Sequence, residues 1–128
     1  METIKSYTDL SQSKKLAEIL PLESADMEYL AIKENGELVG VVPFVKDYSE
    51  VEDSAYNHTY DRIACWSLAA LLGVLPNGTD VVKEETDTEN EKYMCTVGIK
   101  DDIISTFANT PVDACVAMIG KLHELKML

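Results

Sequence analysis

Side chains able to act as nucleophiles or general bases near neutral pH are scarce, with two histidines and three cysteines among 128 residues. His58 precedes Cys65 by seven positions, so one hypothesis is a Cys/His hydrolase with Cys65 as nucleophile and His58 as base. The acidic residues around His58 would raise the pKa of a nearby thiol, and no neighbour is placed to orient the imidazole. We therefore expect no catalytic residue and keep the hydrolase as an alternative.

No metal site or cofactor is expected from the remaining polar residues. Cys65, Cys95 and Cys115 are odd in number and widely spaced, which argues against a disulfide framework and a zinc cluster. These three cysteines are interpreted as small hydrophobic core residues. The acidic run at 84–91 lacks the residue order of a calcium-binding loop, and its pattern is typical of a solvated charged segment.

The charge of the chain restricts its partners. Twenty-three acidic and 11 basic residues give a formal net charge of -12. Such a field repels phosphate backbones and anionic lipid headgroups, and no basic patch interrupts it. We expect no direct nucleic-acid binding and no membrane binding, and a basic protein is the favoured partner. The N-terminus shows no signal-peptide pattern and the longest apolar run, 63–75, is too short to cross a bilayer, which predicts a cytoplasmic location.

A tyrosine-bearing acidic stretch, 46–61, is predicted to be a surface loop because it has no helical or strand periodicity. Tyrosine combines a large rigid ring with a hydrogen-bonding tip, so this loop is a candidate contact for a basic protein. An alternative is that the rings fold back over the hydrophobic core. The candidate binding residues are Tyr48, Glu50, Glu52, Asp53, Tyr56 and Tyr60.

The elements that would position these residues begin with a helix over 10–20, which Asp9 or Ser11 could cap. Strands are predicted at 27–33 and 37–42, and they flank Asn35-Gly36, a pair that favours a tight hairpin turn. The length of the chain is typical of a single domain covering 1–128.

The second half repeats this order of elements. A buried helix is predicted at 66–75, followed by strands at 92–99 and 103–108 that a turn connects. A last helix is expected after Thr110, which can cap it, with Pro111 in the first helical position. The predicted fold class is therefore α+β, with two β-hairpins and three helices.

Similar patterns in the two halves suggest a further hypothesis, an internal duplication of a helix–hairpin unit. The helix ending in Leu20-Pro21 corresponds to the one ending in Leu75-Pro76, with matching apolar positions before each proline. Tyr29 and Tyr93 then stand at corresponding places near the start of a predicted strand.

Three segments, LAEILPLESADMEYL, CWSLAALLGVLP and PVDACVAMIGKLHEL, resemble stretches of small uncharacterised proteins from gut-bacterial phages and prophages. They cover about a third of the chain. The resemblance implies an origin in a mobile element, and it implies no activity or site residue.

Together these observations favour a non-enzymatic accessory protein of a phage or mobile element that acts by binding another protein. The alternatives are the Cys/His hydrolase and a structural component of a phage particle, which would assemble symmetrically. The sequence does not predict the oligomeric state.

Overall fold

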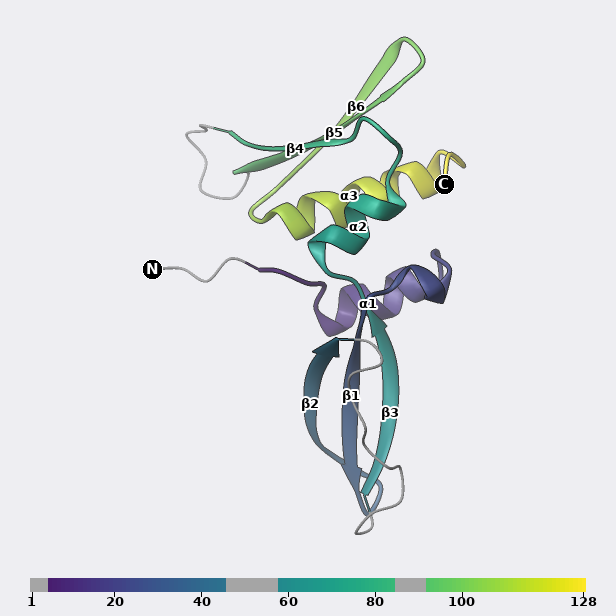
Figure 1. Ribbon diagram of the computed structural model, residues 1–128, viewed down its shortest axis with the longest axis vertical. Helices are drawn as coiled ribbons and strands as arrows, with labels where there is room; N and C mark the ends of the chain where they lie inside the picture. The colour runs from purple at the N-terminus through teal and green to yellow at the C-terminus, as the bar shows by residue number, and fades with distance from the viewer. Residues whose placement is uncertain (1–4, 46–57, 85–91) are drawn as a thin grey trace. The chain divides into compact units, whose positions relative to one another are not determined.

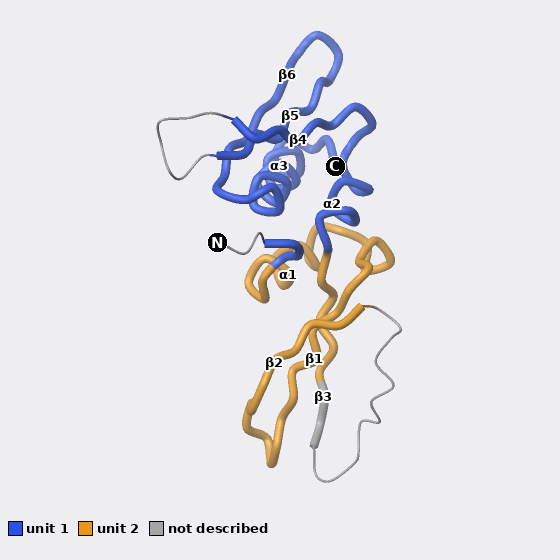
Figure 2. The backbone as a smooth tube through the Cα atoms, turned by 60° about the vertical axis from the view of Figure 1, so that its left-hand side comes forward, with its two compact units in different colours: residues 1–8, 67–128 blue, residues 9–66 orange. Residues whose placement is uncertain are grey.

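A computed structural model describes residues 5–45, 58–84 and 92–128. The fold is α+β, and its described part contains three α-helices and two three-stranded antiparallel sheets. The chain divides into two compact units, which Figure 2 shows in different colours. In the order of their sheets along the chain, the first unit comprises residues 9–66 (orange in Figure 2, labelled unit 2 there), and the second comprises residues 1–8 and 67–128 (blue, labelled unit 1). That the chain forms a single domain stays a prediction.

The first unit is built on a sheet with strand order β2-β1-β3, in which β1 is central and antiparallel to both neighbours (Figure 1). A helix, α1, and a short 3-10 helix, η1, precede the sheet in the chain. The elements are α1 (Leu10–Ala17), η1 (Leu22–Ser24), β1 (Met27–Glu34), β2 (Glu37–Val45) and β3 (His58–Cys65).

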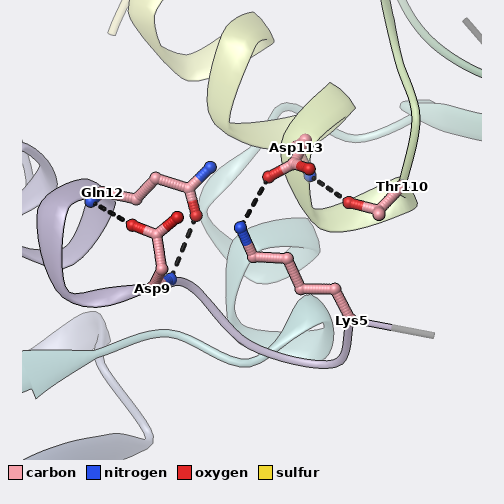
Figure 3. A network of polar contacts seen from close by, with 5 residues as sticks. All are labelled: Lys5, Asp9, Gln12, Thr110 and Asp113. Carbon is pink, nitrogen blue, oxygen red and sulfur yellow. Dashed lines mark hydrogen bonds and ion pairs between the residues drawn. The ribbon is translucent and has the colours of Figure 1, made fainter. Parts of the chain in front are cut away.

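Helix α1 begins at a capping box, which confirms Asp9 as its N-cap. The Asp9 carboxylate accepts a hydrogen bond from the Gln12 backbone N–H at 2.7 Å, and the Gln12 side chain accepts one from the Asp9 N–H at 3.1 Å (Figure 3). These two bonds satisfy backbone donors that a helix leaves open at its start. Leu16 and Leu20 are buried in the core, although α1 ends at Ala17, three residues before the predicted end of the helix.

The predicted Asn-Gly hairpin joins β1 to β2. Asn35 and Gly36 have φ angles of 52° and 84°, the left-handed values that a two-residue hairpin turn requires. β2 continues to Val45, three residues beyond the predicted end, and it lies at the edge of the sheet. Pro43 is tolerated there because an edge strand has one side without ladder partners.

The predicted loop over 46–61 is wrong for its last four residues, because residues 58–61 belong to β3. Two cross-strand ion pairs explain how a polar strand is held: Arg62 of β3 pairs with Glu28 of β1, and Lys33 of β1 pairs with Asp61 at 2.8 Å. Such partners come from a strand about thirty positions earlier, which local periodicity does not reveal. Residues 46–57 lie outside the described part of the chain.

The second unit contains a sheet with strand order β4-β5-β6, in which all neighbours are antiparallel. Helix α3 runs along one face of this sheet (Figure 1). The elements are α2 (Leu68–Val74), β4 (Asp80–Lys83), β5 (Tyr93–Ile99), β6 (Asp102–Ala108) and α3 (Pro111–Glu124). Strand β4 was not predicted, since its four residues lie in a stretch that is otherwise polar.

Helix α3 begins as the sequence predicts. The Thr110 hydroxyl accepts a hydrogen bond from the Asp113 N–H at 3.1 Å, and Pro111 occupies the first helical position. The side chain of Lys5 donates to the Asp113 carboxylate at 2.8 Å, which joins the N-terminal segment to the start of this helix (Figure 3). The fully buried residues of α3 are Val112, Ala114, Cys115, Met118, Ile119 and Leu122.

The two sheets agree with the hypothesis of an internal duplication in one feature and differ from it in another. Tyr29 and Tyr93 both lie in the central strand of their sheet, β1 and β5, and each strand forms a hairpin with the next. The third strand, however, follows the hairpin in the first unit and precedes it in the second. The duplication stays a prediction.

Candidate protein-binding surface

The sheet of the second unit has an inner face covered by α3. Cys95 and Val97 of β5 point to this face and have no exposed surface. Thr106 of β6, which pairs with Cys95, donates its hydroxyl hydrogen to the backbone oxygen of Ala114 in α3 at 2.8 Å. Because side chains alternate along a strand, the residues between these positions point to the opposite face.

That opposite face carries exposed apolar side chains. The strand register places Val82, Met94 and Phe107 in one row across β4, β5 and β6. Val82 is 45% exposed and Phe107 is 49% exposed, while Ile103 on the same side of β6 reaches 74%. We call Val82, Met94, Ile103 and Phe107 the outer face. Single exposed apolar residues are common on protein surfaces, whereas a contiguous group of them marks a contact site.

Polar and acidic groups border the outer face. The neighbouring row across the three strands consists of Asp80, Thr96 and Ser105, and the hydroxyls of the last two lie 3.4 Å apart. Asp101, in the β5–β6 turn, and Asp102, the first residue of β6, are exposed and directly precede Ile103 in the chain. The apolar row is therefore accompanied by carboxylates, an arrangement that suits a partner with an apolar centre and basic surroundings.

Strand β2 of the first unit also exposes apolar residues, but it makes a poorer contact surface. The register with β1 shifts between Ile32 and Lys33, which leaves an extra residue in β2 and bends the strand. A bulge hinders the pairing of an additional strand with a sheet edge, and so does a proline in the edge strand. β2 has both, since Pro43 lies within it. The exposed side chains, which are divided between the two faces, are Leu38, Val39, Val42 and Val45.

Of the six binding residues predicted from the sequence, only Tyr60 lies in the described part of the chain. It belongs to β3, where its backbone pairs with that of Ile32. The other five, Tyr48, Glu50, Glu52, Asp53 and Tyr56, lie outside the described residues. Whether these six residues bind a basic protein stays a prediction.

His58 and Cys65, the two residues of the hypothetical hydrolase, occupy opposite ends of β3. Seven residues of extended strand span about 23 Å of backbone. Cys65 has no exposed surface. A thiol and an imidazole that act as a pair must come within hydrogen-bonding reach, so this strand does not provide the geometry of a catalytic dyad.

The other two cysteines are brought together. Cys95 of β5 and Cys115 of α3 have no exposed surface. Hydrogen bonding between their side chains, together with burial, raises the pKa of Cys115, and the same hydrogen bonding lowers the pKa of Cys95. The expectation that all three cysteines are core residues is confirmed. Their pairing could not be predicted, because twenty positions separate the two thiols.

Within the ranges 5–45, 58–84 and 92–128, no three histidine, cysteine or acidic side chains gather as metal ligands would. No helix in these ranges is long and apolar enough to traverse a bilayer.

The outer face was missed by sequence reasoning for two reasons. Strand β4 was not predicted, so the expected sheet lacked one of its three strands. In β6, apolar residues stand at both Ile103 and Ile104, so alternation alone does not show which side is buried. The sequence feature that indicates β4 is the pair of β-branched residues Val81 and Val82. It lies between a turn at Gly78 and the acidic run, a pattern typical of a short strand.

Comparisons with protein-family models, with curated proteins and with solved structures found no match for this chain.

Proposed function

We propose that this protein is a non-enzymatic accessory protein that binds a basic protein through the outer face of its second unit. The observation that carries the proposal is the row of Val82, Met94 and Phe107, an apolar strip on the side of the sheet that α3 does not cover. Exposed aromatic and methionine side chains are enriched at protein interfaces, because they desolvate a large area at a small entropic cost.

The basic character of the partner follows from charge. The chain carries a net charge of -12, and Asp80, Asp101 and Asp102 accompany the outer face. Complementary charge accelerates association and suppresses wrong partners. A second copy of the chain would bring equal negative charge to the same face, so self-association through it is disfavoured. The origin in a phage or mobile element belongs to the same proposal and rests on the resemblance alone.

The test compares variants of the outer face with a matched variant elsewhere. Phe107→Ser removes the aromatic ring from the row, and Leu38→Ser removes an apolar side chain of similar exposure from β2. Tagged wild type and both variants are used to capture proteins from a lysate of the source organism at low and high salt. A captured protein is then purified, and its dissociation constant is measured by titration calorimetry.

We expect Phe107→Ser to weaken binding of a basic partner by about 10-fold or more, and Leu38→Ser to change it by less than about 2-fold. Added salt should weaken binding further, because it screens the acidic border. Equal binding by the two variants would contradict the proposal. A dimer that dissociates on Phe107→Ser, detected by analytical ultracentrifugation, would instead favour self-assembly and the alternative of a structural particle component.

A further inference from the structure

We propose that the edge strand β6 is a docking edge, to which an extended basic segment of the partner protein is added as a fourth strand of this sheet. The inference rests on the proposed function and deepens it, because it states how the backbone of the partner lies beside the outer face. The observation that carries it is the direction of the backbone groups of β6.

One hydrogen bond fixes these directions. The Glu84 N–H donates to the Lys92 carbonyl at 2.7 Å, which continues the β4–β5 ladder by one pair and directs the backbone of Lys92 towards β4. Because backbone groups alternate along an antiparallel strand, every second residue from Tyr93 to Ile99 directs its own towards β6. The register pairs these residues with every second residue of β6, from Asp102 to Ala108. The residues between them direct their N–H and C=O groups away from β5: Ile103, Ser105 and Phe107.

The side of β6 that faces away from β5 is open in the described part of the chain. No strand there pairs with this side, and no backbone group there bonds to Ile103, Ser105 or Phe107. All three residues are exposed. A row of unpaired backbone donors and acceptors is the template on which another extended chain adds to a sheet. The chemistry of this edge therefore selects an extended polypeptide.

The other edge strands carry features that hinder such an addition. Strand β2 has a bulge and Pro43, β3 carries Asp61 and Arg62, and β4 has only four residues and ends at Lys83. Strand β6, in contrast, has seven residues, a continuous register with β5, and no proline, lysine or arginine. Proteins protect edges with short strands, bulges, prolines and charged side chains, so β6 is the least protected edge in the described residues.

Charge selects a basic occupant. Asp101 and Asp102 are exposed at the start of β6, and the whole chain carries a net charge of -12. A second copy would bring the same carboxylates to the edge, whereas lysine or arginine would be attracted to them. Side chains of an added strand alternate between the two faces, so every second one would lie beside Ile103 and Phe107. The expected segment is extended, with apolar side chains at alternate positions and a basic residue next to the β5–β6 turn.

The probe is a set of synthetic peptides of about nine residues, in which valine, isoleucine or phenylalanine alternates with threonine or lysine. Each peptide is titrated into the full-length protein, and amide hydrogen exchange is followed by NMR with and without the tightest binder. In the free protein, the amides of Ile104 and Thr106 should exchange slowly because they belong to the β5 ladder. The peptide should slow exchange at Ile103, Ser105 and Phe107 by about 10-fold or more and leave the ladder amides unchanged.

A proline variant removes one donor from the edge. Ser105→Pro deletes an N–H that β5 does not use, so the hairpin should be retained while the added strand is blocked. It should weaken peptide binding by about 10-fold or more. Ser105→Ala keeps the N–H and is the matched control, with a change of less than about 2-fold.

A second test leaves the protein unchanged and is independent of how the proline variant folds. N-methylation of every second peptide residue removes the N–H donors from one edge of the peptide. Methylation of the edge that faces β6 should weaken binding by about 10-fold or more, and methylation of the opposite edge by less than about 3-fold. Equal weakening by the two methylated peptides would overturn the proposal.

The remaining outcomes separate this proposal from the proposed function. Peptide binding that Phe107→Ser weakens and Ser105→Pro does not would overturn the added strand and leave the outer face as the contact surface. Binding that neither variant weakens would count against both. No binding by any peptide at about 1 mM would overturn the added strand, while capture with Phe107→Ser would still test the outer face. Edge amides that become protected in the free protein as its concentration rises would show that a second copy, not a basic partner, occupies β6.

Discussion

Trp66 donates its indole N–H to the Ser24 hydroxyl oxygen across 2.9 Å, and that hydroxyl in turn donates to the carbonyl oxygen of Pro21 at 2.6 Å. Trp66 directly follows β3 and is fully buried, whereas Ser24 ends η1. The two bonds therefore fix the connection between α1 and β1 against the end of a strand that is more than thirty positions away.

Replacing Ser24 with alanine should destabilise the protein by about 1–3 kcal/mol, because the buried indole N–H of Trp66 would lose its acceptor. The free energy of unfolding is measured by urea titration, with tryptophan fluorescence as the signal. Ser11→Ala, at an exposed position of α1, is the matched control and should change the stability by less than about 0.5 kcal/mol. Equal effects of the two substitutions would show that this hydrogen bond contributes nothing.

The chain contains a strained residue just after the end of α3. The Met127 N–H donates to the Leu122 carbonyl at 2.8 Å and the Lys126 N–H donates to the His123 carbonyl at 3.0 Å, the pattern of a Schellman motif. This motif requires a left-handed residue, and here it is Lys126, with φ 59°. A side chain at this angle is unfavourable, and glycine is the residue that usually occupies the position.

Lys126→Gly should accordingly stabilise the protein by about 0.5–1 kcal/mol. Lys121→Gly provides a control with the same loss of charge, since Lys121 is an exposed residue inside α3. There, glycine should destabilise by about 1 kcal/mol. Thermal unfolding of both variants measures the difference, and a loss of stability in Lys126→Gly as large as that in Lys121→Gly would contradict this account.

The sequence predicted those elements whose signals are local. Asp9 and Thr110 were recognised as helix caps, and Asn35-Gly36 as a hairpin turn, because each signal depends on a few adjacent residues. Strand β3 was missed because its polar residues are held by β1 through ion pairs such as that of Arg62 with Glu28. Such tertiary partners override local propensity.

The candidate site depends on the same distinction. Assigning Phe107 to an exposed row requires knowing that α3 covers the side of the sheet that contains Cys95, and that β4 extends the row through Val82. Neither fact is encoded in neighbouring residues. The tyrosine-bearing segment, by contrast, was predicted to bind a partner from its composition of tyrosine and acidic residues. Of its candidate binding residues, only Tyr60 lies in the described part of the chain.

At the start of α3, the contributions of a helix cap and of an ion pair to the stability of the protein can be compared directly. Thr110→Ala should cost about 1 kcal/mol, because the Asp113 N–H loses its acceptor. Lys5→Ala should cost less, about 0.5 kcal/mol, since the Lys5–Asp113 pair remains about a quarter to a third exposed, with side chains 26% and 31% accessible. Urea unfolding at low and high salt separates the two: only the Lys5 effect should shrink with salt. A salt-independent Lys5 effect would indicate packing rather than charge.

The hydrogen-bonded cysteines predict an order of ionisation. Burial and the hydrogen bond to Cys95 raise the pKa of Cys115, so its proton should be retained as the pH rises, while the same bond lowers the pKa of Cys95. Protein labelled with ¹³C at the cysteine β carbons allows each thiol to be followed by NMR. As the pH increases, the Cys95 signal should shift first and the Cys115 signal should keep its thiol position for as long as the protein remains folded. Simultaneous shifts of both signals, or an earlier shift of Cys115, would mean that the thiol hydrogen bond runs in the opposite direction or is absent.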